Sequence, residues 1–268
     1  MRILVCVKQV PDTTEIKIDP VKHTLIREGV PAIVNTFDAY ALEVAARIKD
    51  ATPDTTITLL CMGPEQAKAA LTECLAVGGD TAYLVTDRKF GGSDTLATSY
   101  ILATAIKKIE ETEGKFDIIF AGKQAIDGDT GQVGPEIACH LGYPQITYAS
   151  EANVVDGKLQ CKRESDKGYD ILEVAMPAVI TVVKTDFEPR YPTLKSKMAA
   201  KKKPIGIITF ADVESIIDAA RIGLSGSPTK VKKTFTPVRE INCVKIEEED
   251  PAVAAQKALD QLNADKVL

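Results

Sequence analysis

The first half of the chain alternates short apolar runs with longer stretches in which apolar positions recur at a helical period. Four runs rich in aliphatic and β-branched residues predict buried strands: residues 2–7, 56–62, 82–86 and 116–120. Four stretches with apolar positions at helical spacing predict helices: residues 38–49, 65–77, 90–113 and 136–141. This order predicts an α/β fold in which helices cover both faces of a parallel, doubly wound sheet.

The pattern changes after residue 143. Strand-forming residues recur there in three stretches, which predict strands added to the sheet in antiparallel order: 146–150, 153–163 and 169–183. Asp156-Gly157, within the second of these stretches, is a typical hairpin turn signal. Beyond residue 205 there is little periodicity until a terminal helix at 251–262. The glycine- and proline-containing stretch 222–240 predicts an arm that packs on another subunit, or a tail wrapped on its own domain.

A lysine-rich segment with prolines at both ends occupies residues 187–204. It contains a short helix-prone piece, in which Leu194 and Met198 are apolar among polar and basic neighbours. These two side chains are either core residues or an exposed anchor that grips a partner protein.

Composition narrows the function classes. The chain has 268 residues and a net charge of −5, so we do not expect nucleic acid to be a partner. We expect no membrane span, because the apolar runs are strand-sized, and the opening MRILVCVKQV predicts a first strand rather than a signal peptide. A cytoplasmic protein is therefore expected.

Few side chains are suited to acid–base or metal chemistry. None of the six cysteines forms a C-x-x-C pair, and there are only two histidines, so zinc, iron–sulfur and triad sites are not expected. We expect no metal site and no catalytic residue. A catalyst of this composition would take its chemistry from a cofactor.

The strongest candidate site is the stretch 121–137, AGKQAIDGDTGQVGPEI. A strand, a glycine-rich turn and a helix start point free N–H groups at one place, which suits a phosphate. The stretch is neither a Walker loop nor a G-x-G-x-x-G fingerprint, so on spacing alone a turn that binds nothing is equally compatible. The loops after residues 7, 62, 86 and 121 should all leave the same carboxyl edge, and this convergence favours a nucleotide site.

Two neighbouring features leave alternatives open. The excursion 8–35 is either a ligand-bordering loop or a surface flap. Ser93, Asp94 and Thr95 favour a helix cap over a pyrophosphate site. Asn35 or Thr36 is the expected cap of the helix at 38–49.

A family resemblance is carried by motifs spread along the chain: VCVKQVPDT, NTFDAYALE, CMGPEQA, LAVGGD, GKQAID, MPAVITV and EPRYPTLKSKMAAKKK. With these, nearly the whole chain resembles the β subunit of electron transfer flavoproteins. The resemblance implies an adenine nucleotide α-hydrolase-like, nucleotide-binding α/β domain with added antiparallel strands and an extended C-terminal arm. We expect the domain at residues 1–204, including a partner-recognition segment at 187–204, and the arm at 205–268, embracing an α subunit.

The family divides by the nucleotide that its β subunit holds. Simple electron carriers hold a structural AMP, and electron-bifurcating members hold a second FAD. The loop D-G-D-T-G-Q-V-G-P (127–135) looks like the bifurcating version, as do GGSDTLATS and VPDTTEIKIDP. Phe187, in place of the asparagine common in simple carriers, agrees with this assignment.

The resemblance carries specific residues over to this chain. The residues it implies for cofactor binding are Cys6, Asn35, Thr36, Phe37, Asp38, Met62, Gly63, Asp94, Thr95, Gln124, Ala125, Ile126, Asp127, Thr130, Gly131, Gln132, Val133 and Gly134. Backbone N–H groups at 131–134 and the Thr130 hydroxyl would hold phosphates, and the loop 11–33 would border the flavin. Asp127 and Asp129 would cap N–H groups or bind ribityl hydroxyls, with a magnesium pair as the alternative.

The same resemblance implies a function. FAD in this subunit would accept hydride from NADH, send one electron to ferredoxin, and send the other through the α-subunit FAD to an acyl-CoA dehydrogenase. Leu194 and Met198 would bind the dehydrogenase, and Arg190 would lie near the α-subunit interface. Two alternatives remain, an electron shuttle with structural AMP and a nucleotide-binding module without redox work.

Overall fold

The computed structural model describes residues 1–12, 31–232 and 243–268. Residues 1–12 and 31–232 belong to one compact unit, and residues 243–268 belong to a second. The second unit contains helix α8 (Pro251–Ala264), which begins after an Asp250 cap and confirms the terminal helix expected from the sequence.

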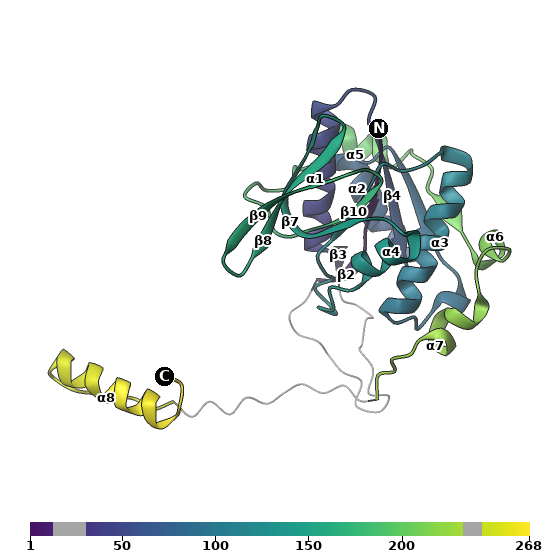
Figure 1. Ribbon diagram of the computed structural model, residues 1–268. Coiled ribbons are helices and arrows are strands. Elements are labelled where there is room, and N and C mark those ends of the chain that lie inside the picture. Colours follow the sequence, from purple (N-terminus) through teal and green to yellow (C-terminus); the bar gives the residue numbers. More distant parts are fainter. Residues whose placement is uncertain (13–30, 233–242) are drawn as a thin grey trace. The chain divides into compact units, whose positions relative to one another are not determined.

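A sheet of nine strands runs through the described part of the first unit (Figure 1). In spatial order the strands are β11 (Gly206–Ile208), β5 (Thr81–Val85), β4 (Thr56–Met62), β1 (Arg2–Cys6), β6 (Ile118–Gly122), β10 (Ala178–Val182), β7 (Gln145–Val155), β8 (Lys158–Ser165) and β9 (Gly168–Val174). The first seven are parallel, and β8 and β9 add an antiparallel ribbon at one edge. The predicted α/β fold is confirmed.

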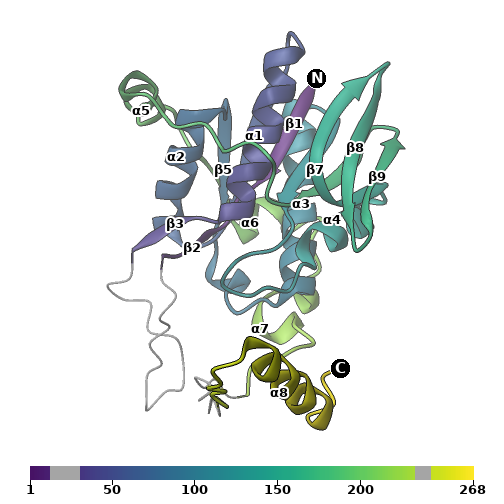
Figure 2. The same cartoon turned by 90° about the vertical axis from the view of Figure 1, so that its left-hand side faces the viewer.

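Helices cover both faces of the sheet, because the central strands carry apolar side chains on both faces. Side chains alternate along β1, so Ile3 and Val5 enter one core cluster while Leu4 enters the other. Helices α1 (Thr36–Ala51) and α2 (Lys68–Val77) contribute to the first cluster, and α3 (Thr95–Glu113) and α4 (Val133–Leu141) to the second. Figure 2 shows β7, β8 and β9 continuing the sheet beyond α1.

The added strands differ in part from the sequence prediction. The stretch 169–183 contains two strands, and the second, β10, is parallel and lies between β6 and β7. The prediction that this stretch only extends the sheet in antiparallel order was wrong. The physical reason is visible in β10 itself, whose residues are all buried, as expected for a central parallel strand. The Asp156-Gly157 turn is confirmed, with both residues at positive φ.

Residues 205–232 belong to the same compact unit as the sheet. Strand β11 pairs with β5, and α6 (Phe210–Val213) buries Phe210 and Val213 against the α3 side of the core. Helix α7 (Gly223–Gly226) follows, and the described part of the unit ends at residue 232. The predicted domain boundary at 204 falls within this unit, and the division into a domain and an arm stays a prediction. Residues 233–242 of the predicted arm lie outside the described residues.

Both ends of the excursion 8–35 are among the described residues. Strands β2 (Gln9–Pro11) and β3 (Ala32–Val34) pair in antiparallel order beside the carboxyl end of β1. Residues 13–30, including most of the loop expected to border a flavin, lie outside the described residues. Helix α5 (Leu194–Ala200), which packs on α2, and three 3₁₀ turns complete the described elements: η1 (Glu65–Ala67), η2 (Arg88–Phe90) and η3 (Ala219–Arg221).

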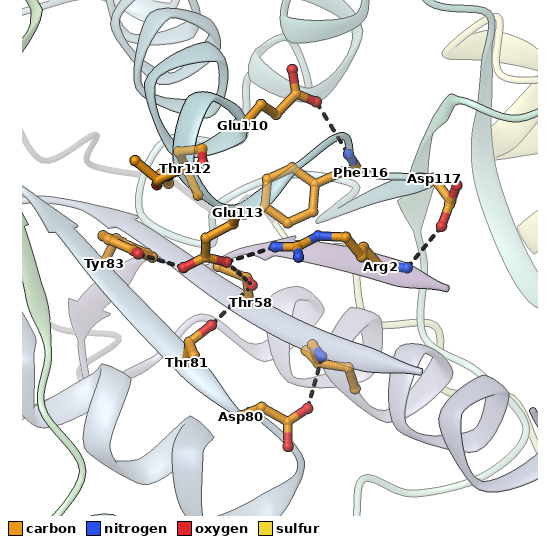
Figure 3. A network of polar contacts seen from close by, with 12 residues as sticks. Arg2, Thr58, Asp80, Thr81, Tyr83, Glu110, Thr112, Glu113, Phe116 and Asp117 are labelled. Carbon is orange, nitrogen blue, oxygen red and sulfur yellow. Dashed lines mark hydrogen bonds and ion pairs between the residues drawn. The ribbon is translucent and has the colours of Figure 1, made fainter. Parts of the chain in front are cut away.

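A polar network fastens the amino edge of the sheet (Figure 3). Glu113, at the end of α3, accepts hydrogen bonds from Arg2 and from the Tyr83 hydroxyl. Burial, together with the Glu113 hydrogen bond, raises the pKa of Tyr83 to about 12. Asp117, just before β6, accepts the Arg2 N–H at 2.7 Å. These bonds hold the amino ends of the strands, opposite the edge where ligands bind in such sheets.

Candidate functional site

The sheet reverses its direction of travel between β1 and β6. From β1 the chain moves outward through β4 and β5, and it then returns to place β6 on the other side of β1. The loops after β1 and β6 therefore diverge and leave a crevice at the carboxyl edge. This switch point is where the fold predicts a ligand.

Helix α1 begins at this crevice, and its first residues reach into both loops. Asn35 occupies the N-cap position but its side chain does not cap the helix. Its amide instead donates to the Gln124 carbonyl at 2.9 Å, and its carbonyl oxygen accepts the Ile126 N–H at 3.0 Å. The predicted position of the cap was right, and the predicted role of the side chain was wrong.

Asp38 lies one turn further along and is buried beneath the crevice. One carboxylate oxygen accepts the Lys8 N–H at 2.7 Å, and the other accepts the Gly122 N–H at 3.0 Å. Burial raises the pKa of Asp38 to about 7, while the hydrogen bonds from the Lys8 and Gly122 N–H groups and the neighbouring Asn35 amide act in the opposite direction. The carboxylate thus ties the end of β1 to the end of β6.

This raised pKa predicts how stability changes with pH. The folded protein holds the Asp38 proton more tightly than the unfolded chain, so the contribution is complete at low pH and is lost as the pH rises through about 7. Between pH 5 and 7 we expect the free energy of unfolding of the wild type to fall relative to Asp38→Asn, by at most about 1.4 kcal/mol per pH unit. Urea unfolding of both proteins at several pH values measures this slope, and parallel curves would contradict it.

The loop after β6 is held by its own polar side chains. Gln124 donates to Asp129 at 2.6 Å, and Lys8 forms an ion pair with Asp127, also at 2.6 Å. Asp129 and Gly131 are both at positive φ, so the backbone bends twice within three residues. Each aspartate therefore has a partner within the chain, and the magnesium pair stays an untested alternative.

The start of α4 closes the loop. The helix begins at Val133, three residues earlier than predicted, so Gly134 lies in its first turn. A Cβ at Gly134 would lie 2.5 Å from the Thr181 Cγ2 atom, so this glycine permits close packing of helix on strand. Thr95 donates to the Gln132 side chain at 2.9 Å, joining the start of α3 to the end of the loop. Phosphate binding by the N–H groups at 131–134 stays a prediction.

The remaining predicted residues lie further along the same edge. The cap interpretation of Asp94 is confirmed, because one oxygen accepts the Ala97 N–H and the other binds Thr229. Burial would raise the pKa of Asp94, but these bonds hold it below its usual value. Met62 is the last residue of β4, and the N–H of Gly63, the next residue, donates to the Val85 carbonyl. Cys6 is buried in the core, where burial raises the pKa of its thiol.

Three residues at this edge were missed from the sequence. Lys8 and Lys123 lie inside motifs that carry the family resemblance, and Lys123 lies over the Phe37 ring at 5.0 Å. Tyr148 has no such signal: it is an exposed residue at a φ of 59°, where β7 shifts register against β10. Its ring lies 5.9 Å from the Lys123 ammonium. A non-glycine residue in this conformation beside a ligand crevice is characteristic of functional sites.

Comparison with known proteins identifies the family. The family model described as "Electron transfer flavoprotein domain" matches residues 22–213. The chain is 54% identical to the electron transfer flavoprotein subunit beta of Megasphaera elsdenii, with both chains fully covered. The chain belongs to the electron transfer flavoprotein family, as a β subunit. It is also 49% identical to the caffeyl-CoA reductase-Etf complex subunit CarD of Acetobacterium woodii over 88% of each chain. To the FixA protein of Azotobacter vinelandii it is 43% identical, over 98% of this chain and 94% of that protein.

The lysine-rich segment of this electron transfer flavoprotein subunit forms helix α5 (Leu194–Ala200), which Thr193 caps. Leu194 is 77% exposed and Met198 is 58% exposed, so neither is a core residue of this chain. Phe187, before the helix, packs under the Arg47 guanidinium at 3.7 Å. The segment therefore presents two apolar side chains on a basic helix.

Arg190 fixes this segment to α1 of the electron transfer flavoprotein subunit. Its guanidinium binds Glu43 through Nε at 2.8 Å and Asp50 through Nη2 at 2.8 Å. Its backbone N–H also donates to Glu43, at 3.0 Å. A cavity of about 280 Å³ lies between this segment, α1 and α2, and its lining includes Val34 and Thr36. The role predicted for Arg190 at an α-subunit interface stays a prediction.

No helix among the described residues of this electron transfer flavoprotein subunit is long and apolar enough to cross a membrane.

Proposed function

We propose that this β subunit pairs with an electron transfer flavoprotein α subunit and holds FAD in the crevice between β1 and β6. The loop D-G-D-T-G-Q-V-G carries this proposal. Residues 126–130 of the loop are exposed, and a Cβ at Gly128 would meet nothing within 4 Å, so the loop keeps open space at the crevice. Apolar Ile126 and Tyr148 are exposed beside it, which suits an aromatic ring system.

The residues present fit a nucleotide with two phosphates. Lys8 and Lys123 supply positive charge at the crevice, and the start of α4 supplies N–H groups. Thr130 offers an exposed hydroxyl. When bound, FAD would accept hydride from NADH and pass single electrons, one toward ferredoxin and one through the α-subunit FAD to an acyl-CoA dehydrogenase. The chain's own residues would position the nucleotide and exclude water.

The similarity to CarD supports this reading. That relative is named as a subunit of a caffeyl-CoA reductase-Etf complex. We therefore propose that the present chain is a subunit of an NADH-dependent acyl-CoA reductase system and is not active alone. The alternative is an electron shuttle with structural AMP in the same crevice, which the same lysines and helix start would also hold.

Nucleotide content tests the proposal directly. The chain is co-expressed with its α partner, the complex is denatured, and the released nucleotides are identified and counted by chromatography. We expect two FAD per heterodimer, with NADH bleaching the flavin of the intact complex. One FAD and one AMP would reject bifurcation and leave the shuttle.

The exposed apolar pair on α5 predicts a separate effect on the dehydrogenase partner. We expect Leu194→Ala to lower kcat/KM for electron transfer with the dehydrogenase roughly 10-fold or more, because a few anchoring side chains carry most of the binding energy of an interface. The rate of flavin reduction by NADH should not change. Steady-state assays at varied dehydrogenase concentration measure both.

Ile171 provides the control for this variant. It is an exposed aliphatic side chain on β9, distant in sequence from α5. Ile171→Ala should leave dehydrogenase kinetics unchanged. Equal losses in the two variants would point to a general effect on the protein and against a docking role for Leu194.

A further inference from the structure

Helix α1 leaves its own N-terminus without a side-chain cap, although the right residues are present. Asn35 is at the N-cap and Asp38 is three residues later, an arrangement that could cap the helix reciprocally. Other helices in the described chain use such residues: Thr209 and Asp212 form a capping box on α6, and Thr193 caps α5. A missing cap typically costs about 1 kcal/mol. These two side chains are therefore committed to something else.

Both side chains leave the helix and bind the two loops at the switch point. Asn35 holds the backbone of the β6 loop at Gln124 and Ile126. Asp38 holds the N–H groups of Lys8, just past β1, and of Gly122, the last residue of β6. Asn35 is 1% exposed and Asp38 is 6% exposed, so water does not compete for these bonds.

The surrounding residues are shaped to allow this arrangement. A Cβ at Gly122 would lie 2.4 Å from the Asp38 Oδ1 atom, so only glycine leaves room for the carboxylate. The Asn35 N–H donates to the Lys8 carbonyl at 2.9 Å, which adds another bond between α1 and the β1 loop. At the surface, the Lys8 side chain also joins the β1 loop to the β6 loop, through its ion pair with Asp127.

We infer that Asn35 and Asp38 form a clamp, here called the α1 clamp, which sets the spacing of the β1 and β6 loops and thereby the retention of the bound nucleotide. The inference rests on the proposed nucleotide site and changes the role of two of its residues. Their polar atoms are used within the chain, so they are positioning residues. Contacts with the nucleotide are left to backbone N–H groups and to the side chains at the rim.

A matched carboxylate exists at the opposite edge of the same two strands. Asp117 precedes β6 and accepts the N–H of Arg2, the first residue of β1 (Figure 3). Asp117→Asn therefore weakens a similar carboxylate-to-backbone bond between β1 and β6, away from the crevice. Asp38→Asn weakens the bond at the crevice.

The test uses the complete complex with its α partner. Release of the bound nucleotide, FAD or AMP, is timed after dilution, and amide hydrogen exchange is measured over residues 8 and 122–132. Losing one hydrogen bond to a charged group predicts roughly 10- to 100-fold faster release for Asp38→Asn, with faster exchange in both segments. Asp117→Asn should lower the melting temperature but keep wild-type release. Equal release rates in the two variants would overturn the inference.

Asn35→Ser separates retention from stability and serves if Asp38→Asn does not fold. Serine is a good N-cap, so α1 gains the cap it lacks, while the bonds to Gln124 and Ile126 are lost. We expect a melting temperature close to the wild type with release at least roughly 5-fold faster. Unchanged release would contradict the clamp. If the complex carries no nucleotide, the proposed function fails, and hydrogen exchange alone decides the clamp.

Discussion

Replacing Gly122 by alanine is expected to destabilise the protein by roughly 3 to 4 kcal/mol and to abolish nucleotide retention. The added methyl group would lie 2.4 Å from the Asp38 Oδ1 atom and 2.8 Å from the Phe37 carbonyl carbon. The second of these is backbone in the first turn of α1, which cannot rotate away as a side chain could. The methyl group must therefore push α1 off the end of β6 and break the two bonds that Asp38 makes.

Gly128 in the following loop gives the matched control. A Cβ there would meet nothing within 4 Å, so Gly128→Ala should change stability by less than about 0.5 kcal/mol. Urea unfolding of the two variants decides the prediction for stability, and nucleotide content is compared between Gly122→Ala and the wild type. A Gly122→Ala protein as stable as Gly128→Ala would contradict the prediction. It would mean that α1 can shift away from Gly122 without loss of folding free energy.

The sequence was sufficient to predict a helix or strand wherever its residues follow one clear pattern of apolar and polar positions. Strand β4 was predicted to the residue, because its run of β-branched and aliphatic residues ends directly before the Gly63-Pro64 turn. The prediction of β10 was less successful, because its apolar run follows β9 after a short break and resembles a continuation of the ribbon. Apolar runs do not reveal which neighbour a strand takes, and the long-range pairing of β10 with β6 decided its direction.

For the candidate site, the sequence indicated which segments meet at the carboxyl edge of the sheet, but it did not indicate the contacts among them. Residue types near Asn35 and Asp38 suggested a helix cap or a ligand, and both are common uses of such residues. Their actual partners, Gln124 and Gly122, are more than 80 residues away in the chain. Tyr148 could not be found at all, because its left-handed backbone arises from a register shift between β7 and β10.

Glu43→Gln should have the other large effect, roughly 2 to 3 kcal/mol of lost stability with a fall in kcat/KM for the dehydrogenase of roughly 10-fold. The carboxylate is 4% exposed and accepts bonds from the Arg190 side chain, the Arg190 backbone and Arg47. Burial would raise the pKa of Glu43, but these bonds hold it below its usual value. The stabilisation is thus complete above the usual glutamate range near pH ~4 and is lost only as the pH falls through the lowered pKa.

The kinetic effect follows because Arg190 is four residues before Leu194, and Glu43 fixes the segment that presents α5. Asp50 supplies the control: it binds the same guanidinium, at 2.8 Å, but its side chain is 63% exposed. Asp50→Asn should cost less than about 0.5 kcal/mol and leave the dehydrogenase kinetics unchanged. If Glu43→Gln lowers stability but not kcat/KM, α5 is held by its packing on α2 alone, and Arg190 is a structural residue with no part in partner recognition.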